Sequence, residues 1–268
     1  MAAPALVLLA HGSTSPLVAE VAHEMRVRMQ EMKPEISVHT AFLDHCPPSG
    51  PQVISRIART RTEEVVFVSM NLSATFEPDE RVQTMVDKVR GAHPRLRFAV
   101  ARPVGPEASL LGLVDAKLRS ALTSAHVAEL DGLVLAAEGA VDQRSQSLLA
   151  RRARQWSMHH KLPVITANAN GTGPGTAAAI AALRAQGRRH VAVGSLFLAP
   201  DEAWQTQAEQ GQRAGAVAVS EPLGAQQELL EIAWGRYAVA AMGMVDVGLE
   251  REQRDTGGTA RHLSVVGA

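Results

Sequence analysis

The sequence is poor in several kinds of residue, and each shortage excludes a class of protein. Cys46 is the only cysteine among 268 residues, which excludes a disulfide framework and a cysteine-rich zinc site. Aromatic residues make up 3% of the chain, so platforms for stacking single-stranded nucleic acid are scarce. The 27 basic and 27 acidic residues balance to zero net charge, which leaves no long-range attraction for nucleic acid or anionic membranes.

Long hydrophobic runs are also lacking. No apolar run approaches the roughly 20 residues that a membrane-spanning helix needs. No basic segment precedes the first apolar run, residues 6–10, so we expect no signal peptide and a cytoplasmic protein. A hydrophobic fraction of 46% is typical of a globular chain, and the length allows one large α/β domain or two of about half its size.

Short apolar runs alternate with segments of helical periodicity along the first half of the chain. We expect strands at 6–10, 36–43, 65–70 and 96–101, and helices at 16–32, 52–59, 78–90 and 108–122. The alternation then restarts, with strands at 133–137, 164–167, 191–198 and 216–219, and helices at 143–159, 176–185, 202–213 and 228–241. Strands that are apolar throughout favour parallel sheets covered by helices on both faces.

The restart also repeats sequence. LVLLAHGS at the beginning of the chain resembles LVLAAEGA from Leu133, VSMNLSA resembles VGSLFLA from Val193, and RPVG resembles EPLG from Glu221. Three matches in the same order indicate a tandem duplication. We therefore predict an N-terminal domain of residues 1–126, a degenerate repeat domain of residues 127–246 and a flexible tail of residues 247–268.

Polar residues follow the predicted strands, at the carboxyl ends where open parallel sheets bind ligands. His11 follows the first strand and suits a metal ligand or a general base, while Gly12 permits a sharp turn and Ser13 can cap the next helix. Asp44 and His45 follow the second strand, and only one of these neighbours should face a site. An ordinary turn at each position remains the alternative.

Two further segments suit ligands. Glu77 follows the third strand, and the stretch NANGTGPGT at 168–176 could offer backbone N–H groups to a phosphate or carboxylate. That stretch lacks the lysine of a P-loop. His159 and His160 are expected to close a helix, where cations suit the helix dipole.

The segment HGS, the strand AFLD and the stretch HPRLRFAVARPVG together resemble the class II tetrapyrrole chelatases, the sirohydrochlorin cobalto- and ferrochelatases. The first half follows the family's order of motifs, and the second half matches the degenerate repeat of long members. The resemblance implies an α/β fold of two tandem flavodoxin-like, chelatase-like domains, each a parallel four-stranded sheet flanked by helices, that face each other across a cleft.

The resemblance also implies a function. It predicts a lyase that inserts Fe²⁺, for siroheme, or Co²⁺, for cobalamin, into sirohydrochlorin, with no cofactor beyond the substrate metal. The expected partners are the tetrapyrrole and a divalent metal ion, without nucleic acid or membrane. The duplication already supplies two facing halves, which is compatible with a monomer. The available ligand types suit Fe²⁺, Co²⁺ and Ni²⁺ alike, so the metal stays open.

Site residues follow from the resemblance position by position. His11 matches the family's metal-binding histidine, Asp44 stands where a glutamate is usual, and Glu77 falls where a second histidine is expected. These three are the expected metal ligands, and His11 and Glu77 the expected catalytic residues. In the second half Glu138 replaces the histidine, and Asp201 and Glu202 occupy the loop that corresponds to Glu77.

The expected substrate carries many carboxylates, so its site should contain hydrogen-bond donors and positive charge. Ser13, Arg81, Gly171 and Gly173 are the expected substrate-binding residues. Two alternatives remain open at this stage. One is a non-catalytic descendant of the family that binds a tetrapyrrole or a metal. The other is an unrelated two-domain α/β protein that uses the glycine-rich loop for an anionic ligand.

Overall fold

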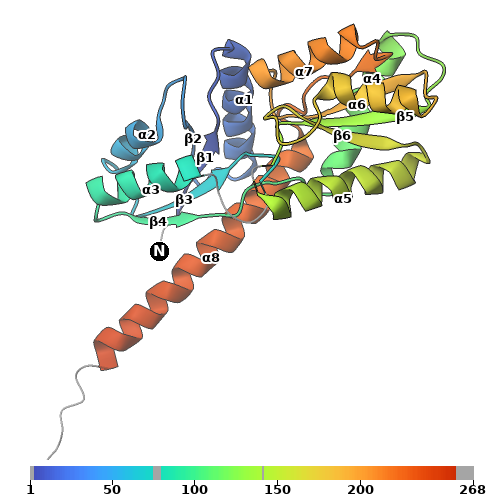
Figure 1. Ribbon diagram of the computed structural model, residues 1–268. Helices are drawn as coiled ribbons and strands as arrows, with labels where there is room; N and C mark the ends of the chain where they lie inside the picture. Colours follow the sequence, from blue (N-terminus) through green and yellow to red (C-terminus); the bar gives the residue numbers. More distant parts are fainter. Residues whose placement is uncertain (1–2, 75–79, 141, 258–268) are drawn as a thin grey trace, which may run out of the picture.

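The computed structural model describes residues 3–74, 80–140 and 142–257 and contains two α/β units of one design (Figure 1). The first unit consists of β1 (Ala5–Ala10), α1 (Pro16–Met32), β2 (Val38–Phe42), α2 (Gly50–Ile57), β3 (Glu64–Ser69), α3 (Glu80–Ala92), β4 (Arg97–Val100) and α4 (Leu110–Ser124). The second consists of β5 (Gly132–Ala137), α5 (Gln143–His160), β6 (Val164–Asn168), α6 (Thr176–Ala185), β7 (Val191–Leu196), α7 (Glu202–Arg213), β8 (Ala218–Val219) and α8 (Gln227–Gly257).

Each unit is built on a four-stranded parallel sheet. The strand orders are β2-β1-β3-β4 and β6-β5-β7-β8, so the second sheet repeats the connectivity of the first. This order is flavodoxin-like, with the first strand of each unit in a central position. The predicted α/β fold of two tandem domains is confirmed.

The central strand β1 is buried along its whole length and sends alternate side chains to two cores. Val7 and Leu9 pack beneath α2 and α3, with Ile54 and Val86 among their neighbours. Leu6 and Leu8 enter a second, larger core on the opposite face. A strand covered on both faces needs apolar residues at every position, which accounts for the unbroken run that the sequence shows.

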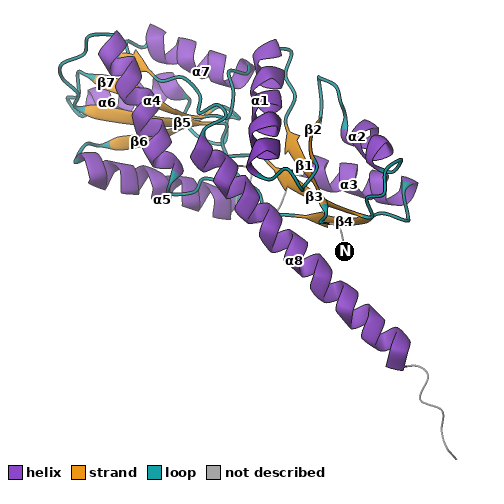
Figure 2. Ribbon diagram, turned by 180° about the vertical axis from the view of Figure 1, so that it is seen from behind, coloured by secondary structure: helices purple, strands orange, loops and turns teal. Residues whose placement is uncertain are grey.

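The larger core belongs to both units, because each unit contributes its last helix to the other. α4 packs on β7 and β8, whereas α8 packs on β3 and β4 (Figure 2). Leu6 and Leu8 of β1 therefore share one core with Leu133 of β5 and Trp234 of α8. The buried hydroxyl of Tyr237 on α8 donates a hydrogen bond of 2.7 Å to the carbonyl of Pro4.

The last helix is longer than the periodicity predicts. α8 runs to Gly257 and extends away from the body of the molecule, so residues 247–257 of the predicted tail continue as helix (Figure 1). The stretch LEREQR in this segment consists of good helix formers, which let a helix propagate without an apolar stripe. Residues 258–268 lie outside the described part, and the boundary at 126 stays a prediction.

None of the helices in the described part of the chain has both the length and the apolar character that crossing a membrane requires.

A glycine on β7 gives the exchanged helix α4 its close approach. A Cβ at residue 194 would lie 2.5 Å from Cη2 of Trp156 and 2.7 Å from Cγ1 of Val114. We expect Gly194→Ala to lower the free energy of unfolding by about 1–3 kcal/mol, because extra methyl groups strain a filled core. Urea denaturation measures this change.

Gly112→Ala on α4 is the matched control. A Cβ there meets no atom within 4 Å, and alanine is the better helix former. Its stability should equal or slightly exceed that of the intact protein. Equal stability of the two variants would contradict the packing of α4 and α5 on β7.

Candidate functional site

The turns after β1 and β2 are joined to each other. His11 follows β1 and is half-buried, and the next residue, Gly12, donates its N–H to Oδ1 of Asp44 over 2.7 Å. The backbones pass so close that a Cβ at Gly12 would lie 1.8 Å from the carbonyl oxygen of Asp44. Glycine is therefore required for this approach. The fold thus brings His11 and Asp44 onto the ends of neighbouring strands.

The second oxygen of Asp44 pairs with the first turn of α3. Oδ2 of Asp44 accepts a hydrogen bond of 2.8 Å from Nη1 of Arg81. An expected metal ligand and an expected substrate-binding residue thus form one ion pair. Since Arg81 is solvent-exposed, the pair adds little stability and can exchange for another partner. The neighbouring His45 is exposed and has φ 55°, so Asp44 alone faces this contact.

Glu77, the third expected metal ligand, lies outside the described residues. Its convergence with His11 stays a prediction.

The turn after β1 also contacts the second unit. Ser13 Oγ donates a hydrogen bond of 2.6 Å to Oε2 of Glu202, the first residue of α7, and Thr14 N–H donates one of 2.9 Å to Oε1. The hydroxyl of Thr14 donates to the same Oε1. Ser13, expected to bind substrate, is buried and engaged with the protein itself. Sequence reasoning placed Glu202 in the corresponding loop but gave no sign of its partner.

This contact changes the acidity of Glu202. Hydrogen bonds from Ser13 and then Thr14 lower the pKa of Glu202 from 4.5 to about 2, because they stabilise the carboxylate form. The preceding residue behaves oppositely. Burial raises the pKa of Asp201, which caps α7 by accepting a hydrogen bond of 2.7 Å from the N–H of Trp204.

The second sheet has the same arrangement of turns with different chemistry. Glu138 follows β5 in the place of His11, and its carbonyl accepts a hydrogen bond of 2.8 Å from Asn170 N–H. Gly139 has φ 98°, and a Cβ there would lie 2.1 Å from Asn170 Oδ1. Gly139 and Asn170 thus correspond to Gly12 and Asp44 in the first unit. The described part of this edge offers a carboxylate and an amide in place of imidazole and carboxylate.

The glycine-rich loop before α6 is exposed at Gly171 and Gly173, and Gly171 has φ 75°. The first amide of α6, Thr176 N–H, is not available to a ligand, because it donates to Oε1 of the buried Gln207 over 2.9 Å. The Thr176 hydroxyl donates to the same oxygen over 2.7 Å. Carboxylate binding at Gly171 and Gly173 stays a prediction.

Comparison with known proteins agrees with this architecture. The sequence model of the CbiX family matches residues 5–121, which contain His11, Asp44 and Arg81. A comparison with curated proteins finds no significant match.

Solved structures share the fold along nearly the whole chain. SirB from Bacillus subtilis with Fe³⁺ superposes with a TM-score of 0.72 at 14% identity, over 89% of this chain and 96% of that one. The sirohydrochlorin chelatase SirB from Bacillus subtilis subspecies spizizenii in complex with cobalt gives 0.71 at 12% identity, over 90% and 96%. CbiX, described as the terminal enzyme for siroheme biosynthesis in denitrifying bacteria, gives 0.60 at 17% identity, over 88% and 99%.

The low pKa of Glu202 makes its contact with Ser13 and Thr14 sensitive to acid. A carboxyl group with a depressed pKa in the folded state adds stability above its ordinary pKa of 4.5, and this contribution is lost as the pH falls toward about 2. We expect Glu202→Gln to show a shallower loss of stability between these pH values than the intact protein. Chemical denaturation followed by circular dichroism at several pH values measures the slope.

Glu209→Gln is the control on the same helix, because Glu209 is an exposed carboxylate paired only with Arg213 among the contacts described. It should keep the slope of the intact protein. An unchanged slope for Glu202→Gln would show that the contact between the two units does not persist in solution.

Proposed function

We propose that the protein is a chelatase that inserts Fe²⁺ or Co²⁺ into a sirohydrochlorin-type tetrapyrrole. The match of the CbiX family model to residues 5–121 supports this proposal, as does the fold shared with the solved SirB and CbiX structures over 88–90% of the chain. The observation that supports this most directly is the joined pair of strand ends. The hydrogen bond from Gly12 to Asp44 joins the turn that contains His11 to the turn after β2, within the matched segment. The products would be siroheme or a cobalt precursor of cobalamin.

Metallation of a tetrapyrrole needs a group that presents the metal and a base that accepts two pyrrole protons. His11 is suited to either task, since a neutral imidazole is both a metal ligand and a base near neutral pH. Asp44 would supply an oxygen ligand, which Fe²⁺ and Co²⁺ accept less tightly than imidazole. Glu77, which follows β3 in the chain, is proposed as the further ligand and base. Weak coordination suits a metal ion that must be transferred to the tetrapyrrole.

The ion pair between Asp44 and Arg81 links metal and substrate in this proposal. When Asp44 turns to the metal, its ion pair with Arg81 opens, and the Arg81 guanidinium can bind a carboxylate of the tetrapyrrole. Backbone N–H groups at Gly171 and Gly173, and the turn at Ser13, would contact further carboxylates. The divalent metal is a substrate, and no other cofactor enters the proposal.

The reaction can be followed directly. Anaerobic mixing of the protein with sirohydrochlorin and Fe²⁺ or Co²⁺, in parallel, should change the tetrapyrrole absorption faster than in the control without protein. We expect His11→Ala to slow this change at least about a hundredfold, the size expected for loss of a general base. His23→Ala is the control, because His23 is an exposed histidine on α1 in the same unit.

Two results would contradict the proposal. Equal rates for the intact protein and His11→Ala would remove the role assigned to His11. Tight binding of the tetrapyrrole without metallation would favour the non-catalytic descendant, an alternative motivated by Glu138 and by the two partners that already engage Asp44.

Asp44→Asn separates the chemical role of this residue from its structural one. The amide oxygen of asparagine can still accept the N–H of Gly12, so the joined turns should persist, whereas the charge is removed. We expect metallation to slow by about tenfold or more while the midpoint of urea denaturation changes little, because an exposed ion pair contributes about 0–1 kcal/mol. An unchanged rate would leave Asp44 with a structural role alone.

A further inference from the structure

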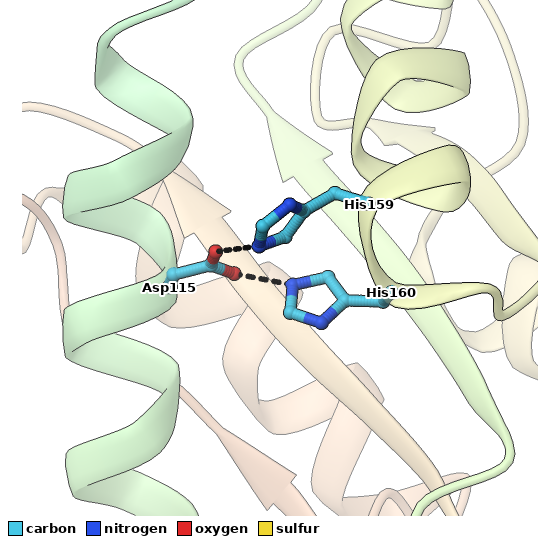
Figure 3. A group of neighbouring side chains, drawn as sticks. All are labelled: Asp115, His159 and His160. Atoms are coloured by element: carbon cyan, nitrogen blue, oxygen red, sulfur yellow. Dashed lines mark hydrogen bonds and ion pairs between the residues drawn. The ribbon is translucent and has the colours of Figure 1, made fainter.

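A second group of metal-ligating side chains lies on α4 and α5. Asp115 of α4 faces His159 and His160, the last two residues of α5 (Figure 3). One potential ligand atom from each residue lies within 4.8 Å of the others. None of the three residues belongs to the turns of the proposed chelatase site, so the inference stands independently of the proposed function.

The carboxylate in this group is held in place by a buried side chain. Trp156 Nε1 donates a hydrogen bond of 2.5 Å to Asp115 Oδ1, and Trp156 is only 1% exposed because it packs against Gly194 of β7. Metal-binding carboxylates are commonly oriented by such hydrogen bonds. Asp115 is thus a fixed ligand, with its side chain 15% exposed.

The two imidazoles surround this carboxylate at suitable distances. His160 Nε2 lies 2.8 Å from Oδ1, and His159 Nε2 lies 3.9 Å from Oδ2. A tetrahedral metal with bonds of about 2.1 Å requires donor atoms about 3.4 Å apart, a value between these two. The rings stand nearly perpendicular, at 83°, with centroids 4.8 Å apart. Small side-chain rotations would place all three donors around one ion.

The two histidines differ in their exposure to solvent. The side chain of His159 is 72% exposed and that of His160 is 29% exposed, so an ion can reach the carboxylate from solvent along His159. Favourable charge at a helix end explains a histidine in the last turn of α5, but it does not explain why two of them converge on one anchored carboxylate.

We propose that Asp115, His159 and His160 form a binding site for a divalent transition metal of borderline softness, such as Zn²⁺ or Co²⁺. Two imidazoles and one carboxylate favour these ions over Mg²⁺ and Ca²⁺, which prefer oxygen ligands throughout. The fourth position would hold water. Because α4 precedes β5 in the chain and α5 follows it, the metal would crosslink the exchanged helix to the unit that it covers.

The test is a titration of the metal-free protein with Co²⁺, followed by calorimetry and by the visible absorption of tetrahedral Co²⁺. The intact protein should bind one Co²⁺ more per chain than the His159→Gln/His160→Gln double variant, which should lose the corresponding absorption. Asp115→Asn should lower the affinity of this site for Co²⁺ at least tenfold. Its amide oxygen can still accept the hydrogen bond from Trp156, so its fold should be retained.

His190→Gln is the matched control. His190 lies near two carboxylates, 3.6 Å from Glu129 and 4.0 Å from Asp131, but offers a single imidazole. The His190→Gln variant should bind as many Co²⁺ ions per chain as the intact protein. Co²⁺ should also raise the thermal midpoint of the intact protein and of His190→Gln more than that of the double variant, since binding to the folded state alone stabilises it.

The outcomes separate the two proposals. If the double variant binds as many Co²⁺ ions as the intact protein with unchanged affinity, the site on α4 and α5 does not exist. If the double variant loses one ion while no metal is inserted into sirohydrochlorin, the site stands and the proposed function fails. If His11→Ala loses a Co²⁺ ion and the double variant loses none, the site on α4 and α5 is overturned.

Discussion

The two units are held together by a reciprocal exchange, in which the last helix of each unit packs on two strands of the other unit's sheet. α4 packs on β7 and β8, and α8 packs on β3 and β4. Leu6 of the first unit and Trp234 of α8 lie in one core. Because its side chains are densely packed, the two units cannot easily slide past each other. The relative placement of the units is therefore fixed by buried apolar contacts. The polar contact from Ser13 to Glu202 and the cluster around Asp115 both depend on this placement.

The two sheets have the same architecture, but the residues at the carboxyl ends of their strands differ. In both, the turns after the first two strands approach each other closely at a glycine, Gly12 in the first unit and Gly139 in the second. In the first unit the N–H of Gly12 donates to the carboxylate of Asp44, next to a half-buried histidine, whereas in the second unit the backbone N–H of Asn170 donates to the carbonyl of Glu138. The duplication has therefore kept the architecture of the edge twice while placing imidazole beside carboxylate in the first unit.

The sequence is informative about elements and weak about which elements meet. The helix predicted at residues 16–32 has these bounds in α1, and the restart of the pattern predicts the repeated sheet. An apolar stripe on α4 or α8 shows that a helix is covered, but not which sheet covers it, so the exchange could not be predicted. Asp115 and His160 are 45 residues apart, and each is unremarkable in its own helix. Glu202 could be assigned to a helix start, yet its partners lie in the other unit.

The long separation in sequence between α8 and the sheet on which it packs has a consequence for synthesis on the ribosome. The first four strands leave the exit tunnel early, and α1 covers part of the face that includes Leu6, Val66 and Val68. The part of that face over β3 and β4 has no covering helix until α8 has been translated. The nascent first half therefore exposes an apolar surface until α8 has been made, a situation that favours aggregation unless chaperones shield it. The cover of the first sheet is therefore completed only when a helix from the second half of the sequence has been made.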